Sequence, residues 1–494
     1  MKKIIQYLVI AIFAVSLASC EKFLDQELHQ AIDANSAILN MEDAQVALNG
    51  CYDGLQEIQL FARDLFVIAD LASDNSRMNA QNAGRFISIY QWNFSTNDGW
   101  ITGVWNYGYQ TLYRVNKLLI DVAALEDVDE AERDQIMGQA LVIRALLYFE
   151  LVNYFGQTYS YDGTATHYGV PLITEPIGPD ENPGRDMVED IYNQILLDLE
   201  GDGTTLGAID LLVSGSNPFV IDLNAARALL SRVYLYMVDP DNPTSEESAA
   251  NLQKSSDYAQ DVINSGLYSL ISHDHFRDSW FLDSYDQHSE QIFYLRFTEV
   301  DNWSVDMIGA MYMETGYGDI LATTDLLDLY DAGDVRLGWF RESGDLNFIE
   351  KYPGRRADYT IPENEVNVAV NNHPIFRLAE MYLNAAEAEA LLGNNETAAT
   401  LLSAITTRAG AAPVLETGDD LVNRIKDERR KELCFEGHRL WDLQRWHENV
   451  ERTDLTSPNI ISEVEYGSYL YAYPIPDREI QANPVIAEQQ NPGY

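Results

Sequence analysis

The stretch from Phe376 to Trp446 constrains the fold more than any other part of the chain. Its first arm, Phe376 to Leu392, is apolar and alanine-rich and is followed by Gly393, which is typical of the position just after a helix. A second arm carries apolar residues at i, i+3, i+4 and i+7 and ends at Gly410. The unit is about 34 residues long, which is the tetratricopeptide period. We therefore predict a mostly α fold with a tetratricopeptide-like helical-hairpin scaffold.

A charged segment, Glu428 to Trp446, follows the hairpin, and we expect it to form one long helix. Its apolar stripe runs into Arg429, Glu432 and Glu436, and charges that face a core are costly unless they are paired. The segment is therefore either a catalytic carboxylate pair or a structural ion network. Pairing with arginine would keep the acids ionised and passive, which favours the network. The expected pairs are Arg429–Glu432, Glu432–Arg439 and Asp442–Arg445.

The N-terminus has the pattern of an export signal. Lys2 and Lys3 precede an apolar run, Ile4 to Leu17, that is shorter than the about 20 residues of a membrane span. The run ends in Leu-Ala-Ser-Cys20, which resembles a bacterial lipobox, where the Cys becomes the lipid-bearing mature N-terminus. We expect residues 1–19 to be a lipoprotein signal peptide and Cys20 to be lipidated. The alternative is an ordinary secreted protein with a chance Cys.

Charge and composition narrow the classes of partner. The chain has 78 acidic and 32 basic residues, a net charge of −46, and such a surface repels nucleic acid and anionic lipid. A hydrophobic content of 46% excludes general disorder. Beyond the N-terminal run, we expect no segment to cross a bilayer. We therefore predict no nucleic-acid partner, membrane attachment through the lipid alone, and neutral rather than polyanionic ligands.

Two cysteines remain, Cys51 and Cys434, and both lie in helical, apolar contexts. Buried free thiols are the favoured reading because no disulfide framework spacing appears, although an oxidising compartment would permit a disulfide.

Aromatic residues gather in polar, irregular stretches. Trp92 and Trp100 lie in the loop QWNFSTNDGW, outside the helix that we expect to follow. Exposed rings among Asn, Asp and Thr are typical of a sugar platform, but a loop ring can equally fold back on the core. From roughly Leu267 to His373 helical periodicity fades, and glycine turns and aromatics are frequent. This region is either a ligand-binding insertion or a less regular second core.

Catalytic and metal signatures are weak. The sequence has no G-x-S-x-G elbow, no Walker A loop and no H-E-x-x-H. His273-Asp274-His275 does not place both imidazoles on one helix face. Asp239-Pro240-Asp241-Asn242 offers oxygen ligands for calcium but lacks the glycine and terminal Glu of an EF-hand. We therefore expect no enzyme activity, no cofactor and no motif-borne metal site.

Several stretches together resemble one family. RLAEMYLNAAEA (377–388), the ER-x2-EL-x-FEG-x-R-x2-DL-x-R pattern (428–445), A-x3-RA-x2-YF-x-LV-x-YFG (140–156) and the tail QQNPGY are similar to SusD/RagB lipoproteins of Bacteroidetes. The resemblance implies one composite domain, 20–494. Its parts are an N-terminal helical-repeat part (20–270), an irregular ligand-binding insertion (271–373), and a C-terminal repeat with the family tail (374–494).

The resemblance also implies a function in nutrient uptake and polysaccharide utilisation. Family members capture oligosaccharides at the outer face of the outer membrane and act as the lid of a TonB-dependent SusC-like barrel that imports them. Two alternatives stay open: a RagB-like component that binds peptides, or a repeat-scaffold adaptor that binds only proteins.

No family motif fixes individual binding residues, but family ligand contacts lie in loops that correspond to the regions described above. We expect aromatic residues there to stack on the ligand and charged residues to contact its polar groups. The expected stacking residues are Trp92, Trp303 and Tyr317, and the expected polar contacts are Asp74, Arg77 and Arg355.

Overall fold

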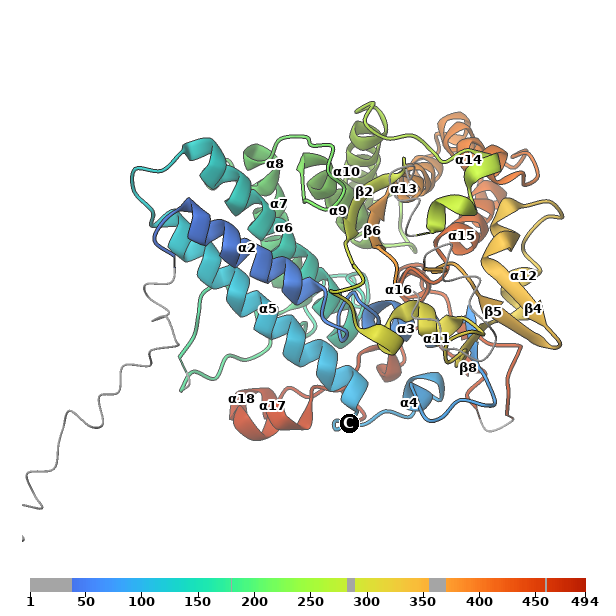
Figure 1. The fold of residues 1–494 in the computed structure, drawn as a ribbon, viewed down its shortest axis with the longest axis horizontal. Coiled ribbons are helices and arrows are strands. Elements are labelled where there is room, and N and C mark those ends of the chain that lie inside the picture. Colours follow the sequence, from blue (N-terminus) through green and yellow to red (C-terminus); the bar gives the residue numbers. More distant parts are fainter. Residues whose placement is uncertain (1–37, 179, 282–288, 355–369, 458–459) are drawn as a thin grey trace, which may run out of the picture.

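The computed structural model describes residues 38–178, 180–281, 289–354, 370–457 and 460–494. Helices dominate it, as predicted, and strands are few and short (Figure 1). The helices of the N-terminal half are α2 (Met41–Leu55), α3 (Asp64–Leu71), α4 (Ile87–Tyr90), α5 (Gly99–Ala123), α6 (Glu130–Phe155), α7 (Val188–Glu200), α8 (Ala208–Leu211), α9 (Leu223–Tyr236) and α10 (Glu246–Ile263).

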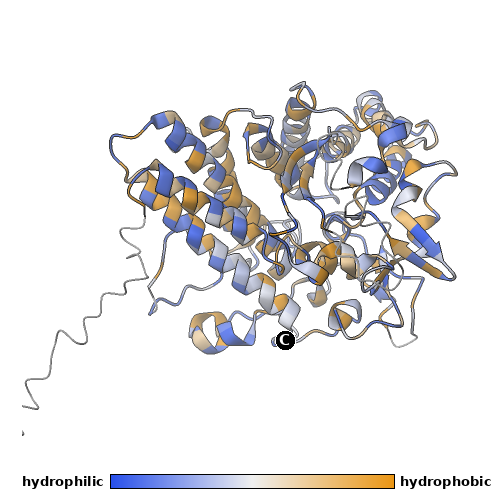
Figure 2. Cartoon of the chain, viewed as in Figure 1, coloured by the Kyte–Doolittle hydropathy of each residue, from blue (hydrophilic) through white to orange (hydrophobic). Residues whose placement is uncertain are grey.

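Antiparallel helix pairs build this half. In Figure 1, α2 and α5 lie alongside each other on the outside of α6 and α7. The apolar residues of α2 and α5 recur on one face, so that orange and blue alternate along both helices in Figure 2. The Asp98 carboxylate caps α5 by accepting the backbone N–H groups of Trp100 and Ile101 at 3.0 and 3.4 Å.

Helix α6 is the central helix of the scaffold. Its length and hydropathy would allow it to cross a membrane, so the expectation that no segment beyond the N-terminal run is long and apolar enough for this is wrong. However, 83% of its most apolar window is buried inside the protein. A helix that is apolar on all sides and covered by other helices belongs to the core.

The C-terminal half contains the predicted hairpin. Its arms are α13 (Leu378–Leu391) and α14 (Asn395–Ala409), and the glycines expected at their ends, Gly393 and Gly410, have φ values of +85° and +74°. Only glycine adopts this left-handed region without strain. The remaining helices of this half are α11 (Ile308–Tyr312), α12 (Thr324–Leu327), α15 (Asp419–Leu433), α16 (Arg439–Arg445), α17 (Asp477–Ala482) and α18 (Pro484–Ala487).

The expectation of one long charged helix is wrong. A turn separates α15 from α16, with Phe435 and Gly437 at φ values of 64° and 80°. The buried carboxylate of Asp70, in α3, accepts the backbone N–H groups of both turn residues at 3.0 and 2.9 Å. A Cβ at Gly437 would come within 2.9 Å of Phe66. The helix therefore breaks where the chain docks on α3.

Within the described residues, the strands form three small antiparallel sheets. One has the order β1-β3-β5-β4, from β1 (Ser76–Met78), β3 (Ile320–Ala322), β5 (Leu346–Ile349) and β4 (Phe340–Ser343). The others pair β2 (Gln291–Leu295) with β6 (His373–Arg377), and β7 (Val450–Glu451) with β8 (Glu463–Val464). In the first sheet Arg77 is the register partner of Leu321, so the sheet joins the N-terminal half to the irregular region.

The two cysteines are buried and unpaired with each other, as favoured from the sequence. Burial raises the pKa of the Cys51 thiol to about 12 and that of the Cys434 thiol to about 11. Both thiols are therefore protonated and unreactive at neutral pH.

Candidate functional site

The charged segment forms a buried ion network. The Glu432 carboxylate accepts hydrogen bonds from Arg377 at 2.8 Å, Arg408 at 2.6 Å and Arg336 at 3.0 Å, and all four side chains are buried. Burial opposes ionisation of Glu432, but the three guanidinium groups outweigh it and lower its pKa well below the ordinary value. A carboxylate held ionised by three arginines is not available as an acid or base.

The pairs in this network differ in part from the predicted ones. Asp442 and Arg445 pair at 2.9 Å, as expected. The predicted Arg429–Glu432 and Glu432–Arg439 pairs are wrong, because Arg429 reaches Asp442 at 2.8 Å and Arg439 reaches Asp74 at 2.7 Å. The network ties α15 and α16 to the rest of the fold and is structural.

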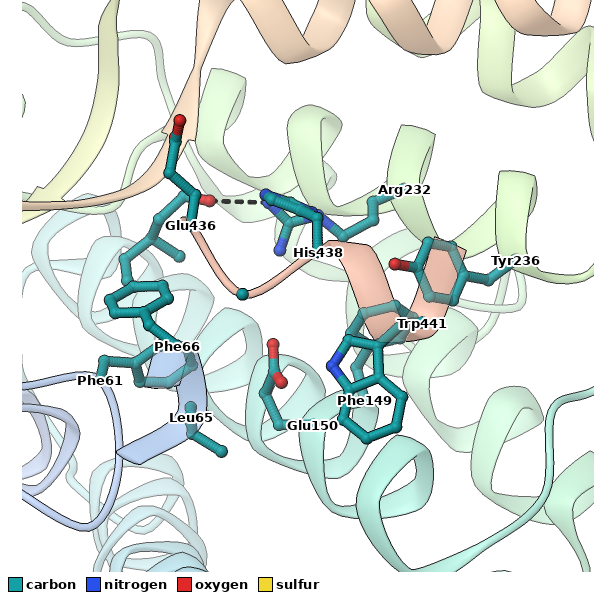
Figure 3. Close-up of a pocket in the computed structure, with 12 residues that line it drawn as sticks. Phe61, Leu65, Phe66, Phe149, Glu150, Arg232, Tyr236, Glu436, His438 and Trp441 are labelled. Atoms are coloured by element: carbon teal, nitrogen blue, oxygen red, sulfur yellow. Dashed lines mark hydrogen bonds between the residues drawn. The ribbon is translucent and has the colours of Figure 1, made fainter. Parts of the chain in front are cut away.

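A small internal cavity lies beside the network (Figure 3). Glu150 of α6 points into it between Phe66 and Trp441, with His438 above. The cavity measures about 20 Å³, which is room for about one water molecule and too little for a sugar or peptide. Burial raises the pKa of Glu150 to about 7. The size of the cavity, not this pKa, excludes a sugar or peptide from it.

Two predicted site residues lie inside the protein. Trp92 is 3% exposed and its ring packs edge-on against Tyr471 at 5.5 Å, so it folds back on the core and offers no free ring face. Asp74 is buried and binds Arg439 and Arg430 at 2.7 and 3.3 Å. The expected direct contacts from these two residues do not fit their burial.

Of the two further predicted polar residues, Arg77 lies in the described part of the chain. Arg77, on β1, lies with its Nε 3.1 Å from Asp454 and donates from Nη2 to the backbone oxygen of Asp345 at 2.7 Å. Its side chain is 13% exposed, so it holds the end of the sheet while keeping an edge accessible. Arg355 lies outside the described residues.

Two of the predicted residues, Trp303 and Tyr317, have partly exposed rings. Trp303 is 40% exposed, and its indole N–H donates to the backbone oxygen of Gln56 at 2.8 Å, which fixes the ring while leaving part of it uncovered. Tyr317 is half-buried, and the Arg85 guanidinium lies 3.5 Å from its ring centre. Arg85 also binds the Asp319 carboxylate at 2.8 Å.

Charged and aromatic side chains connect these two rings. Arg63 reaches Asp306, three residues after Trp303, at 3.3 Å, and its guanidinium lies 5.3 Å from the ring centre of Phe86. Phe86 stacks on Trp100, with the two ring centres 4.0 Å apart. Phe86 directly follows Arg85 in the chain. We call the partly exposed Trp303, Asp306, Trp100, Arg85 and Tyr317, together with the buried Arg63 that links them, the Trp303–Tyr317 face.

Sequence reasoning missed Arg85 and misplaced Trp100. Arg85 ends the polar stretch 74–85 that interrupts the helical pattern, so its position in a binding-type loop was visible. Trp100 was expected in a loop but occupies the first turn of α5, because Asp98 caps that helix two residues earlier. The signal was the Asp followed by an apolar helical pattern.

The chain is similar to known proteins along nearly its whole length. A sequence model described as "Starch-binding associating with outer membrane" matches residues 22–235, and one described as "SusD family" matches residues 348–494. A SusD-like protein of Formosa agariphila is 23% identical, and the alignment covers 99% of this chain and 99% of that one.

Solved structures agree. A SusD superfamily protein from Bacteroides thetaiotaomicron superposes with a TM-score of 0.80 at 28% identity, over 92% of this chain and 100% of that one. A protein described as a putative sugar-binding protein from Bacteroides vulgatus gives 0.80 and 28%, over 93% and 100%. The two sequence models, the full-length relative and these structures lead to one assignment: the chain belongs to the SusD-like family.

Proposed function

We propose that this protein is a non-enzymatic glycan-binding protein of the outer membrane that captures oligosaccharides at the Trp303–Tyr317 face. The observation that carries the proposal is the part-exposed Trp303 ring, fixed by its bond to Gln56 and flanked by charged groups. The C–H faces of a sugar ring pack on an aromatic face, while neighbouring polar groups bind its hydroxyls. The side chain of Asp306 is 49% exposed and can accept hydrogen bonds from sugar hydroxyl groups.

The placements support a different role for each group of predicted site residues. Trp303 and Tyr317 act as stacking residues, and Arg85 and Arg77 act as polar contacts at their accessible edges. Asp74 and Trp92 act indirectly, because Asp74 fixes the loop after α3 through Arg439 and Trp92 supports the neighbouring loop. Arg355 remains a predicted contact that lies outside the described residues.

The family assignment supports the ligand class. One matching sequence model is described as starch-binding and as associating with the outer membrane, and one similar structure is described as sugar-binding. A net charge of −46 further favours a neutral glycan over an acidic one.

Attachment and delivery complete the proposal. We infer that Cys20 carries a lipid that holds the protein on the extracellular side of the outer membrane. The captured glycan then passes to a SusC-like TonB-dependent barrel, over which the protein closes as a lid by a hinge movement. The lipobox-like Leu-Ala-Ser-Cys sequence and the family assignment support these steps.

The test is a glycan-array screen of the protein from Glu21 onward, followed by calorimetry of each hit. Binding to one class of neutral polysaccharide, without release of reducing sugar, would support the proposal and identify the cargo. A blank array with peptide binding would instead favour the RagB-like alternative. If the protein binds neither glycans nor peptides but does bind other proteins, the result would favour an adaptor.

A further inference from the structure

A second, larger cavity lies away from the residues of the Trp303–Tyr317 face. The segment 157–169 forms one wall and the C-terminal stretch 467–492 forms the other, and the cavity measures about 550 Å³. This size is in the range of small-molecule sites. The first wall is the Tyr-, Thr- and Gly-rich segment whose composition is not that of a helix or a buried strand. We call this cavity the tyrosine groove.

Three tyrosines line the groove with part of each side chain uncovered. Tyr161 is 41% exposed, Tyr168 43% and Tyr469 45%. Surface tyrosines occur singly on most proteins, but three around one cavity make an aromatic lining. We propose that the tyrosine groove is a second carbohydrate-binding site, which takes a neutral sugar unit by stacking on these rings.

The rings of Tyr161 and Tyr469 are each held from one side. Tyr161 packs edge-on against His167 at 5.3 Å, and its Cε2 lies 3.6 Å from where a Cβ of Gly467 would stand. Tyr469 packs edge-on against Tyr494 at 5.4 Å. Aromatic rings fixed in this way lose little conformational entropy when a ligand binds.

Arg185 joins the two walls of the groove. It is buried, and it donates to the backbone oxygens of Gly169 at 2.7 Å and Tyr168 at 3.1 Å on one wall. It also donates to the backbone oxygen of Gln489 at 2.7 Å and to the Asn491 side chain at 2.8 Å on the other. Gln157 adds a bond to the backbone oxygen of Ser468 at 3.0 Å. The groove is therefore preformed rather than assembled by a ligand.

The lining groups select a neutral ligand. The guanidinium of Arg185 has five N–H donors, and it bonds five oxygens, the fifth being the backbone oxygen of Phe155 at 2.8 Å. All five donors of this guanidinium are therefore used within the protein, and none of them remains for an anion. Glu488 also lines the groove, and its carboxylate repels acidic sugars but can accept hydrogen bonds from the hydroxyl groups of neutral ones. A neutral pyranose offers an apolar face that can stack on the tyrosines and hydroxyl groups that can donate to Glu488.

The ligand class rests on the proposed function, but the two sites share no residue and can be tested separately. Two sites on one protein raise the avidity for a long glycan, because binding at the first raises the effective concentration at the second.

The test is hydrogen–deuterium exchange of the purified protein with maltohexaose, laminarihexaose, cellohexaose and xylohexaose, each tested alone. The proposal expects slower exchange in 157–169 and 467–492 with at least one probe. Protection confined to 79–86 and 298–318 would overturn the groove and leave the proposed function intact. Protection confined to the groove would overturn the Trp303–Tyr317 face instead. No protection anywhere would overturn both.

Variants test whether the three tyrosine rings themselves stack on the sugar. The triple variant Tyr161→Ala, Tyr168→Ala, Tyr469→Ala should lose the groove protection and weaken binding there at least tenfold, while the triple Phe variant keeps most of it. The matched control is Tyr113→Ala, which removes a 51% exposed tyrosine on α5. Equal protection in the triple Ala variant and the control would overturn the proposal.

Discussion

The Arg85 guanidinium lies 3.5 Å from the ring centre of Tyr317 and at the same time binds Asp319 at 2.8 Å. Arg85 comes from the loop after β1, whereas Tyr317 and Asp319 precede β3, its neighbour in the sheet. A cation over an aromatic face contributes about 0.5–1 kcal/mol at an exposed site. The contact therefore fixes the Tyr317 ring beside the sheet, at one end of the surface that we propose binds sugar.

Replacing Trp303 with Ala should weaken glycan binding at least tenfold, which corresponds to about 1.4 kcal/mol. The melting temperature should change little, because the ring is 40% exposed and its bond to Gln56 lies at the surface. Calorimetry with the array hit and a thermal scan measure the two effects. Trp303→Phe is the control and should retain part of the affinity. Unchanged affinity in the Ala variant would remove Trp303 from the site.

Trp92→Ala should act on stability instead. The ring is 3% exposed and packs against Tyr471, and truncating a buried aromatic typically costs about 3–5 kcal/mol of unfolding free energy. Denaturant unfolding should show this loss, and Trp92→Phe should recover part of it. A Trp92→Ala protein with wild-type stability and weakened glycan binding would return Trp92 to the list of contact residues.

Glu432→Gln should also destabilise the fold, because it leaves Arg377, Arg408 and Arg336 without their shared carboxylate. Breaking a buried ion pair by removing one partner costs about 3–5 kcal/mol. The midpoint of urea unfolding measures the loss. Glu451→Gln, at an exposed position of β7, is the matched control and should be neutral. A loss equal to that of the control would show that the network contributes nothing to stability.

The helices were predictable because their signals are local. Apolar spacing and the glycines at 393 and 410 define α13 and α14 within a few residues. The partners of the charged segment were not, since Glu432 pairs with Arg377 and Arg336, which are 55 and 96 residues away. The break at Phe435 has the same cause, because Asp70 bonds the turn from 365 residues away.

The same contrast between local signals and long-range contacts applies to the candidate site. Trp92 and Trp303 both occur among polar neighbours, so their sequence contexts do not distinguish them. Trp92 is covered by Tyr471, which is 379 positions later, whereas Trp303 remains part-exposed. Long-range packing decides which ring is free, and sequence periodicity contains no information about it.

Asp74→Asn should change how the free energy of unfolding depends on pH in the acidic range. Burial opposes ionisation of Asp74, but Arg439 and Arg430 outweigh it and lower its pKa from 3.8 to about 2. A lowered folded-state pKa stabilises the protein fully above 3.8 and loses this effect as the pH falls through about 2. The difference in unfolding free energy between wild type and variant should thus be constant above pH 4 and shrink below it. A difference that does not vary with pH would contradict the assigned pKa.

Glu150→Gln should have the opposite pH dependence. Burial raises the folded-state pKa of Glu150 from 4.5 to about 7, although Arg232 acts against it. Because the folded protein binds this proton more tightly than the unfolded chain, wild-type stability relative to the variant should fall as the pH rises from 4.5 to 7. Parallel denaturant unfolding at pH 5 and pH 8 measures the change. Glu130→Gln, an exposed residue in the first turn of the same helix, is the matched control and should show no such trend. Parallel pH profiles for wild type and Glu150→Gln would mean that the cavity in Figure 3 leaves this carboxylate as well solvated as it is in the unfolded chain.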